Sequence, residues 1–237
     1  MLVVIIGFLL LAPSASAHQP RLVEGTSTEI TNPEVSQAFY GELMGDPAVF
    51  RIVSGKPFKL YVGILVPDIP NVAKDISAEI VLMGSNPDDG LFPYQLYGLS
   101  SSWASFHEEF GNDDYFWGPE FKAPDSAPQT PAGVEVGPGT YLITVFSPNN
   151  NGKYVLVVGE KEVFPFDEIV NTVRVMPTLK SEFFGKPSWH AFYNLTGLFL
   201  LIPVLGALIV IALIWRFIIV LRRRKRNVIG GTFARHS

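Results

Sequence analysis

The sequence predicts an all-β ectodomain, an antiparallel β-sandwich, followed by a juxtamembrane helical segment and one transmembrane helix. Three observations lead to this expectation. Short segments rich in Val, Ile, Phe and Tyr alternate with turns rich in Gly, Pro and Asn over much of the chain. Residues 195–215 form an uncharged, apolar stretch. A basic cluster follows at residues 222–226, which is typical of the cytoplasmic side of a membrane span.

The N-terminal apolar stretch, residues 2–11, is too short to cross a bilayer. It leads into a run of small residues that ends at Ala17, a pattern typical of a signal-peptidase site. We therefore expect residues 1–17 to be a cleaved signal peptide and His18 to be the first residue of the mature protein. The alternative interpretation is an uncleaved anchor. The lack of Lys or Arg before the apolar run counts against the signal peptide.

Residues 18–160 carry the pattern of strands. Segments 48–53 and 57–66 are separated by a Ser-Gly-Lys break, and residues 77–83 read as a further strand. Residues 139–146 and 153–158 are predicted to pair as a hairpin, because the intervening Asn and Gly residues accept positive φ. Short strands at this spacing favour a sandwich. The Pro-rich segment 119–138 is predicted to be a long surface loop.

Residues 161–193 are predicted to form a helical juxtamembrane segment. Phe166, Ile169, Val170 and Val173 recur at helical spacing, and Pro177 then interrupts the pattern. The segment is expected either to pack on the sandwich as a stalk or to lie in the membrane interface.

Residues 194–221 are predicted to be the transmembrane helix, and residues 222–237 a basic cytoplasmic tail. At 1.5 Å per residue, the uncharged stretch spans roughly 31 Å, the thickness of the hydrocarbon layer. The expected location is therefore the cell membrane, with a single crossing, the N-terminal domain outside the cytoplasm and the C-terminal tail inside.

Charge is divided unevenly between these parts. Residues 18–193 carry 11 Lys plus Arg and all 22 Asp plus Glu, whereas residues 194–237 carry seven basic residues and no acidic ones. An ectodomain this acidic is a poor candidate for binding nucleic acid, while divalent cations and basic partners remain compatible with it. The absence of Cys excludes a disulfide framework and thiolate metal sites.

One family resemblance is carried by the last strands. Residues 138–145, Pro-Gly-Thr-Tyr-Leu-Ile-Thr-Val, and residues 152–158, Gly-Lys-Tyr-Val-Leu-Val-Val, resemble the closing strands of bacterial pre-peptidase C-terminal domains. Residues 58–83 are similar to the earlier strands of those domains. The resemblance implies a small β-sandwich with a binding or accessory role rather than a catalytic one.

The segment 103–121 is the first candidate for chemistry, since it gathers titratable groups among aromatic residues. Asp113 and Asp114, with Glu109, are oxygen ligands of the kind that Ca²⁺ prefers, although their spacing is not that of an EF-hand. The alternative is an acidic loop that its aromatic residues hold against the sandwich.

A second hypothesis concerns copper. If cleavage exposes His18, its amino group and imidazole can chelate one Cu²⁺, and the imidazole of His107 is the candidate for completing a nitrogen-rich site.

No residue spacing matches a known catalytic or cofactor signature, so the sequence does not favour an enzyme. We expect a non-catalytic binding or structural role at the cell envelope. The expected partners are the lipid bilayer and an unidentified protein or other envelope component. The alternative is a copper-binding or redox protein that uses His18 and His107.

Overall fold

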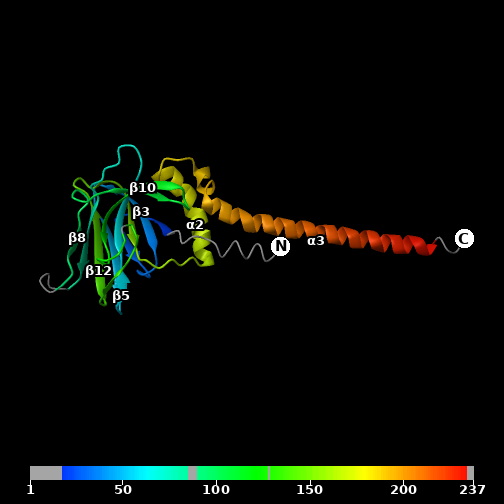
Figure 1. Cartoon of the computed structure of the whole chain (residues 1–237), viewed down its shortest axis with the longest axis horizontal. Coiled ribbons are helices and arrows are strands. Elements are labelled where there is room, and N and C mark those ends of the chain that lie inside the picture. The colour runs from blue at the N-terminus through cyan, green and yellow to red at the C-terminus, as the bar shows by residue number, and fades with distance from the viewer. Residues whose placement is uncertain (1–17, 85–89, 128, 234–237) are drawn as a thin grey trace.

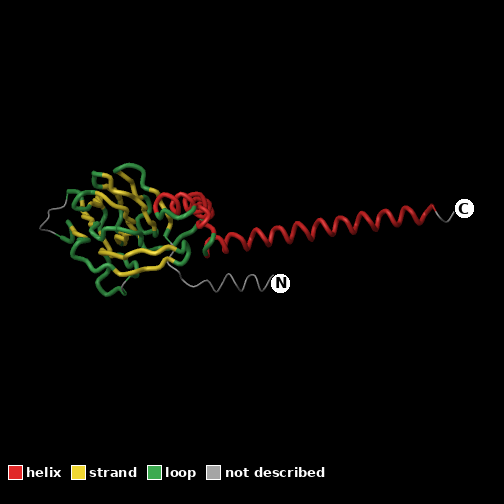
Figure 2. The backbone as a smooth tube through the Cα atoms, turned by 90° about the horizontal axis from the view of Figure 1, so that it is seen from above, coloured by secondary structure: helices red, strands yellow, loops and turns green. Residues whose placement is uncertain are grey.

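The chain forms two stacked β-sheets with helices against the outer face of one sheet (Figures 1 and 2). The computed structural model describes residues 18–84, 90–127 and 129–233, and within α3 it leaves out the side chains of residues 195, 196, 199, 200, 203 and 221–233. The expected signal peptide, residues 1–17, lies outside the described residues. The predicted β-sandwich is confirmed.

The first sheet has six strands in the order β1-β3-β13-β6-β10-β9. All its neighbours are antiparallel except β1 and β3, which run parallel at the edge. Its strands are β1 (Gln19–Leu22), β3 (Gln37–Met44), β6 (Val62–Pro67), β9 (Ala104–Glu108), β10 (Asp113–Phe121) and β13 (Asn151–Val158).

The second sheet has five strands in the order β2-β4-β12-β7-β8, again with one parallel pair, β2 and β4. A separate ribbon pairs β11 with β5. The strands of these two units are β2 (Ser27–Ile30), β4 (Ala48–Ser54), β5 (Phe58–Leu60), β7 (Ser77–Leu82), β8 (Tyr94–Leu96), β11 (Val134–Val136) and β12 (Gly139–Phe146).

The main hydrophobic core lies between the two sheets. Phe50 and Ile143 of the five-stranded sheet are completely buried there, as are Ile64 and Leu156 of the six-stranded sheet. Aromatic rings join the layers, since the ring of Phe50 meets that of Tyr154 edge-on at 6.4 Å between centroids. Alternate residues of each strand therefore supply this core, as a sandwich requires.

The six-stranded sheet is also covered on its other face. Along β6 and β13, successive residues are buried on both faces of the sheet. Val62 and Ile64 face the main core, whereas Leu65, Val155 and Val157 belong to a second apolar cluster. This second cluster is completed by residues of the C-terminal helical segment, including Met176, Leu179, Phe183, Phe184 and Ala191.

That helical segment consists of α2 (Phe166–Thr178), a π-helical turn η1 (Leu179–Phe183) and a 3₁₀ turn η2 (Ser188–Phe192). Of the two arrangements left open by the sequence, packing on the sandwich is the one observed (Figure 1). Pro177 does not end α2 at once, but it lacks an amide hydrogen, and the backbone continues as the π turn directly after it.

Three sequence expectations about the strands are wrong. The segments 139–146 and 153–158 do not form a hairpin, because β12 pairs with β4 and β7 while β13 pairs with β3 and β6. Residues 57–66 form two strands, β5 and β6, in different sheets. The segment 119–138 is not one loop, since it contains the end of β10 and all of β11.

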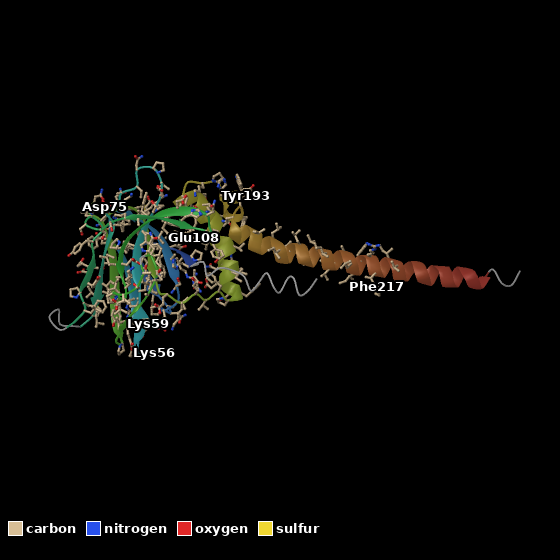
Figure 3. All side chains as sticks on the ribbon, in the orientation of Figure 1. Lys56, Lys59, Asp75, Glu108, Tyr193 and Phe217 are labelled. Atoms are coloured by element: carbon tan, nitrogen blue, oxygen red, sulfur yellow. The ribbon has the colours of Figure 1, made fainter. Side chains whose placement is uncertain are left out.

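The last helix, α3 (Leu195–Phe233), projects away from the sandwich (Figure 1). Figure 3 shows Tyr193 at its base and Phe217 well along it. In the part of the chain that the structure describes, no helix combines the length and apolarity needed to cross a membrane. The predicted span, residues 194–221, includes six residues whose side chains lie outside that description. The side chains of the whole predicted tail, residues 222–237, also lie outside it.

Candidate functional site

A cavity of about 310 Å³ lies between the outer face of the six-stranded sheet and the helical segment. Its wall is mostly apolar, because α2 and η1 turn aliphatic side chains toward the aromatic residues of the sheet. The lining residues are His18, Pro20, Tyr40, Glu108, Phe110, Gly111, Asp113, Tyr115, Phe164, Ile169, Thr172, Val173, Met176, Leu179 and Phe184. This is the concave, apolar kind of site that small molecules occupy in proteins.

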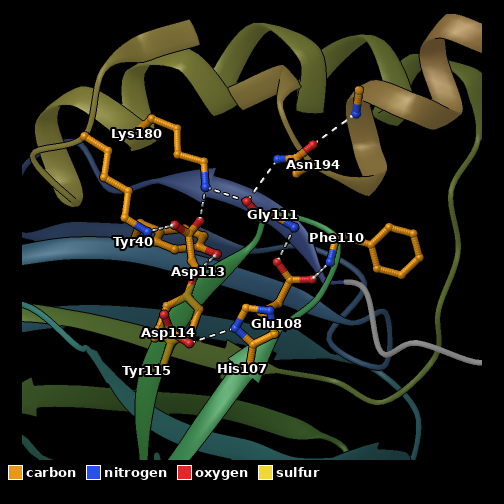
Figure 4. Close-up of polar contacts among 12 residues, drawn as sticks. Tyr40, His107, Glu108, Phe110, Gly111, Asp113, Asp114, Tyr115, Lys180 and Asn194 are labelled. Carbon is orange, nitrogen blue, oxygen red and sulfur yellow. Dashed lines mark hydrogen bonds and ion pairs between the residues drawn. The ribbon is translucent and has the colours of Figure 1, made fainter. Parts of the chain in front are cut away.

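One end of the cavity is formed by the turn between β9 and β10. The carboxylate of Glu108 accepts hydrogen bonds from the backbone amides of Phe110, at 2.8 Å, and Gly111, at 2.6 Å (Figure 4). Asn112 takes the left-handed conformation, with φ of 58°, that such a tight turn needs. Burial raises the pKa of Glu108, although the two amide hydrogen bonds oppose the shift.

A buried ion pair fixes this turn to the helices. The Lys180 ammonium lies 2.5 Å from Oδ2 of Asp113, and both side chains are at most 3% exposed. It also donates to the carbonyl of Gly111 at 2.6 Å, while Lys186 donates to the other oxygen of Asp113 at 2.9 Å. Burial lowers the pKa of Lys180, and the hydrogen bond and charge of Asp113 work against that shift.

The same turn contacts the start of α3. Asn194 donates from Nδ2 to the Gly111 carbonyl at 2.9 Å, and its Oδ1 accepts from the amide of Gly197 at 3.0 Å (Figure 4). Asn194 therefore caps the first turn of α3 and ties it to the wall of the cavity.

Two tyrosines form the floor of the cavity. The hydroxyls of Tyr40, on β3, and Tyr115, on β10, lie 3.1 Å apart and hydrogen-bond each other. Burial raises the pKa of both hydroxyls far above the ordinary value, so both stay protonated. Their rings meet Phe183 and Phe184 edge-on, at 5.2 Å and 5.5 Å between centroids.

His18 lies where the chain enters β1. Its Nδ1 hydrogen-bonds the hydroxyl of Ser36, and its Nε2 is shielded from solvent without a partner. The Oγ1 of Thr172, on α2, is likewise shielded and unpartnered. Burial lowers the pKa of His18 to about 4, so the imidazole is neutral at physiological pH.

The three residues predicted to bind Ca²⁺ are not arranged around one point. Asp113 and Asp114 are successive residues of β10 and face opposite sides of the sheet: Asp113 is buried against two lysines, whereas Asp114 is largely exposed. Glu109 is an exposed residue of the turn. Among the described residues, no group of three or more His, Asp or Glu side chains is placed to hold a metal ion. Calcium binding therefore stays a prediction.

The two histidines of the copper hypothesis are also separated by the sheet. His107 hydrogen-bonds Asp114 at 2.7 Å and is half exposed. Its neighbour Glu108 lines the cavity with His18, and successive residues of a strand face opposite ways, so His107 points away from His18. The structure thus keeps His18 as a candidate ligand without His107 beside it.

Several residues of the site had no signal in the sequence that marked them as functional, among them Tyr40, Thr172 and Lys180. One available signal was the unbroken apolar run Val155–Val158 at the end of β13, since a strand without alternation is typical of a sheet covered on both faces. It would have favoured a docked helical segment.

No protein-family model matches the chain, and no relative was found among curated proteins. Solved structures that are similar to it include the following two. One is the pre-peptidase C-terminal domain of collagenase from Bacillus anthracis, with 11% identity over 60% of this chain and 95% of that chain and a TM-score of 0.29. The other is CorA, a surface-associated copper-binding protein important in copper acquisition by Methylomicrobium album BG8, with 11% identity over 60% of this chain and 100% of that chain and a TM-score of 0.23.

A pre-peptidase C-terminal domain, the kind of domain that the sequence resembles, is thus among the similar structures. At 11% identity, such a likeness concerns the fold alone.

Replacing Asp113 by Asn is expected to destabilise the protein strongly. The change removes the carboxylate that pairs with Lys180 and leaves the ammonium buried with neutral acceptors alone, and breaking such a pair typically costs about 3–5 kcal/mol. Chemical unfolding of the full chain, followed by near-UV circular dichroism, measures the loss. The control is Asp114→Asn on the exposed face, expected to change stability by less than about 0.5 kcal/mol. Equal effects of the two variants would show that the buried pair does not hold the helices.

Acid is expected to destabilise the protein through His18. The unfolded chain binds this proton with a pKa near 6.5 and the folded chain with a pKa of about 4, so the unfolded state holds more protons between these values. Stability is complete above pH 6.5 and falls toward pH 4, by up to about 3 kcal/mol. The difference between the wild type and His18→Gln in unfolding free energy against pH isolates this contribution, because Glu108 titrates in both. If the curves of unfolding free energy against pH run parallel for the wild type and His18→Gln, His18 does not make this contribution.

Proposed function

We propose that the chain is a membrane-anchored extracytoplasmic β-sandwich protein with a non-catalytic binding role at the cell envelope. Its binding site is the cavity between the six-stranded sheet and α2. The observation that carries the proposal is that a mostly apolar cavity of about 310 Å³ contains two shielded polar atoms without partners, His18 Nε2 and Thr172 Oγ1. Buried polar groups are normally hydrogen-bonded, so such atoms point to a bound molecule or ordered water.

The arrangement of charge supports binding rather than catalysis. Both carboxylates in the wall already accept hydrogen bonds, Glu108 from backbone amides and Asp113 from two lysines. Neither is left free to act as a general base, and the tyrosine hydroxyls bond each other. What remains is a largely apolar space.

Anchoring is the second part of the proposal and rests on the sequence. Residues 194–221 are the crossing, residues 222–237 the cytoplasmic tail, and residues 1–17 the leader that directs the sandwich outward. The exposed aromatic residues Trp189 and Tyr193, just before α3, suit the membrane–water boundary. The bilayer is thus one partner, and a protein or another envelope component is a further one.

A second candidate function is copper binding at His18. One observation favours it: the imidazole is neutral and its Nε2 is unpartnered in the cavity wall, at the residue that would begin the mature chain. A neutral imidazole with a free nitrogen is a suitable ligand for Cu²⁺.

Filling the cavity is expected to abolish binding. The full chain, purified from native membranes, should release a small organic molecule in stoichiometric amount on solvent extraction and mass spectrometry. Val173→Trp places an indole in the cavity, so the molecule should be lost, while Val170→Trp, on the exposed side of the same helix, should retain it. Equal yields from both variants, or none from the wild type, would contradict the cavity as the site. Stoichiometric copper that His18→Ala removes would establish the second candidate instead.

Alkaline carbonate treatment of membranes tests the anchor. The full chain is expected to stay in the pellet, and protease added to intact cells should digest the sandwich, because residues 194–221 span the bilayer with the sandwich outside. A truncation after residue 193 should be extracted and serves as the control. Release of the full chain into the supernatant would refute the anchor.

A further inference from the structure

Few hydrogen-bonding groups in the cavity wall are left without a partner. Glu108 and Asp113 have donors on all of their carboxylate oxygens, and of the hydroxyls of Tyr40 and Tyr115 one donates to the other, which leaves one hydroxyl hydrogen available. Among the described residues of the lining, His18 Nε2 and Thr172 Oγ1 are the side-chain atoms that are shielded from solvent without any partner. A ligand that fits this wall therefore has one polar group and an otherwise apolar surface.

Both unpartnered atoms lie where α2 meets β1. Asn171, next to Thr172, donates to the carbonyl of Pro20, two residues after His18, at 3.4 Å. Arg21 and Glu168 join the same two elements through two contacts of 2.7 Å. The polar end of a ligand is thus expected at this junction, with its apolar part running toward Met176 and Phe184.

A hydroxyl group is the ligand group that suits both atoms, His18 Nε2 and Thr172 Oγ1. The Thr172 hydroxyl both donates and accepts, and His18 Nε2 does one or the other according to the tautomer set by its bond to Ser36. A group that can itself donate and accept, as an alcohol can, satisfies both atoms in either tautomer.

Charge selects against an anionic ligand. No lysine or arginine side chain is among the described residues that line the cavity, whereas Glu108 and Asp113 are. The amino group that cleavage after Ala17 would leave on His18 is the one cation among the described residues of this wall. The nearest ammonium groups, Lys180 and Lys186, are directed to Asp113. A carboxylate or phosphate would enter a largely apolar space in which no lining side chain supplies a counter-ion, which is unfavourable. A cation finds both carboxylates already occupied.

Size sets the final limit. A volume of about 310 Å³ is at the lower end of small-molecule sites, roughly 300–1,000 Å³. It suits a single chain or ring system rather than a lipid with two acyl chains.

We infer that the cavity takes a neutral amphiphile, a molecule with one alkyl-like apolar body and one hydroxyl-type end that hydrogen-bonds His18 and Thr172. This inference rests on the proposed binding function of the cavity and names the chemical class of its ligand. The ligand enters the space between the six-stranded sheet and α2, with its hydroxyl end at the junction of α2 and β1.

Photolabelling of the full chain in lipid nanodiscs tests this inference. The probes are a medium-chain alcohol with a diazirine in its chain, and the carboxylate and the amine with the same chain. Labelled peptides are mapped by mass spectrometry, and for each probe the labelling of the wild type is divided by that of Val173→Trp, which corrects for partition into the bilayer. The alcohol is expected to label α2 and β10 several-fold above this reference, and the charged probes are not.

The polar contact has its own matched variants. Thr172→Val removes the hydroxyl at constant shape and should lower labelling by the alcohol about two- to tenfold, the value of one hydrogen bond. Thr178→Val, on the same helix but outside the lining, should leave it unchanged.

Two failures are distinguishable. If the carboxylate or the amine labels the cavity as well as the alcohol, or if Thr172→Val has no effect, the ligand class is wrong while the binding site stands. If no probe labels the wild type above Val173→Trp, the proposed function of the cavity fails as well.

Discussion

The outer face of the six-stranded sheet is apolar, and covering it is the constraint on which the rest of the structure depends. Leu65, Val155 and Val157 would be exposed to water if the chain ended with β13. Burial of such side chains contributes about 1.5–3 kcal/mol each, so the sheet needs a second layer. The helical segment supplies it, and the space left between the two layers is the cavity.

Apolar packing alone does not fix how the helices lie on this sheet. The Lys180–Asp113 pair does, because a buried ammonium has few acceptable partners and residues 67 positions apart must therefore meet in one register. The pair adds little net stability, since desolvation offsets much of its attraction. Its effect is specificity: together with the bonds from Lys180 and Asn194 to Gly111, it fixes the β9–β10 turn, the helices and the start of α3 relative to one another.

Local sequence patterns were sufficient to predict a β-sandwich, but they did not predict which strands pair with each other. Strands β4, β7 and β12 were predictable because each has residues that alternate between the core and the surface. The false hairpin arose because the Asn- and Gly-rich loop after Phe146 indicates a turn but not that the chain changes sheets there. The β9–β10 hairpin was not predicted, because the many acidic residues of this segment were interpreted as a loop or a metal site. Its aromatic residues do alternate between the two faces of the sheet: Tyr115 and Trp117 belong to the second cluster, and Phe116 packs against the main core.

The site was less predictable than the fold, because it joins elements that are far apart in sequence. His18 and Asp113 were singled out for metal chemistry, and both do lie in the cavity wall. Their partners were not foreseeable, since nothing near Lys180 or Thr172 in the sequence indicates that α2 and η1 dock on the sheet at that register. Long-range packing, not local propensity, decides which polar groups have hydrogen-bond partners and which have none.

Hydrogen exchange of the α2 amides in the full chain tests the docking of the helices most directly. A helix of 13 residues is marginal in water by itself, so its amides are protected only if it packs on the sheet. The account predicts that α2 exchanges at least about a hundredfold more slowly than unstructured chain, and that Asp113→Asn removes this protection while β4 and β12 keep theirs. Exchange of α2 in the wild type at the rate of an unstructured chain would contradict it.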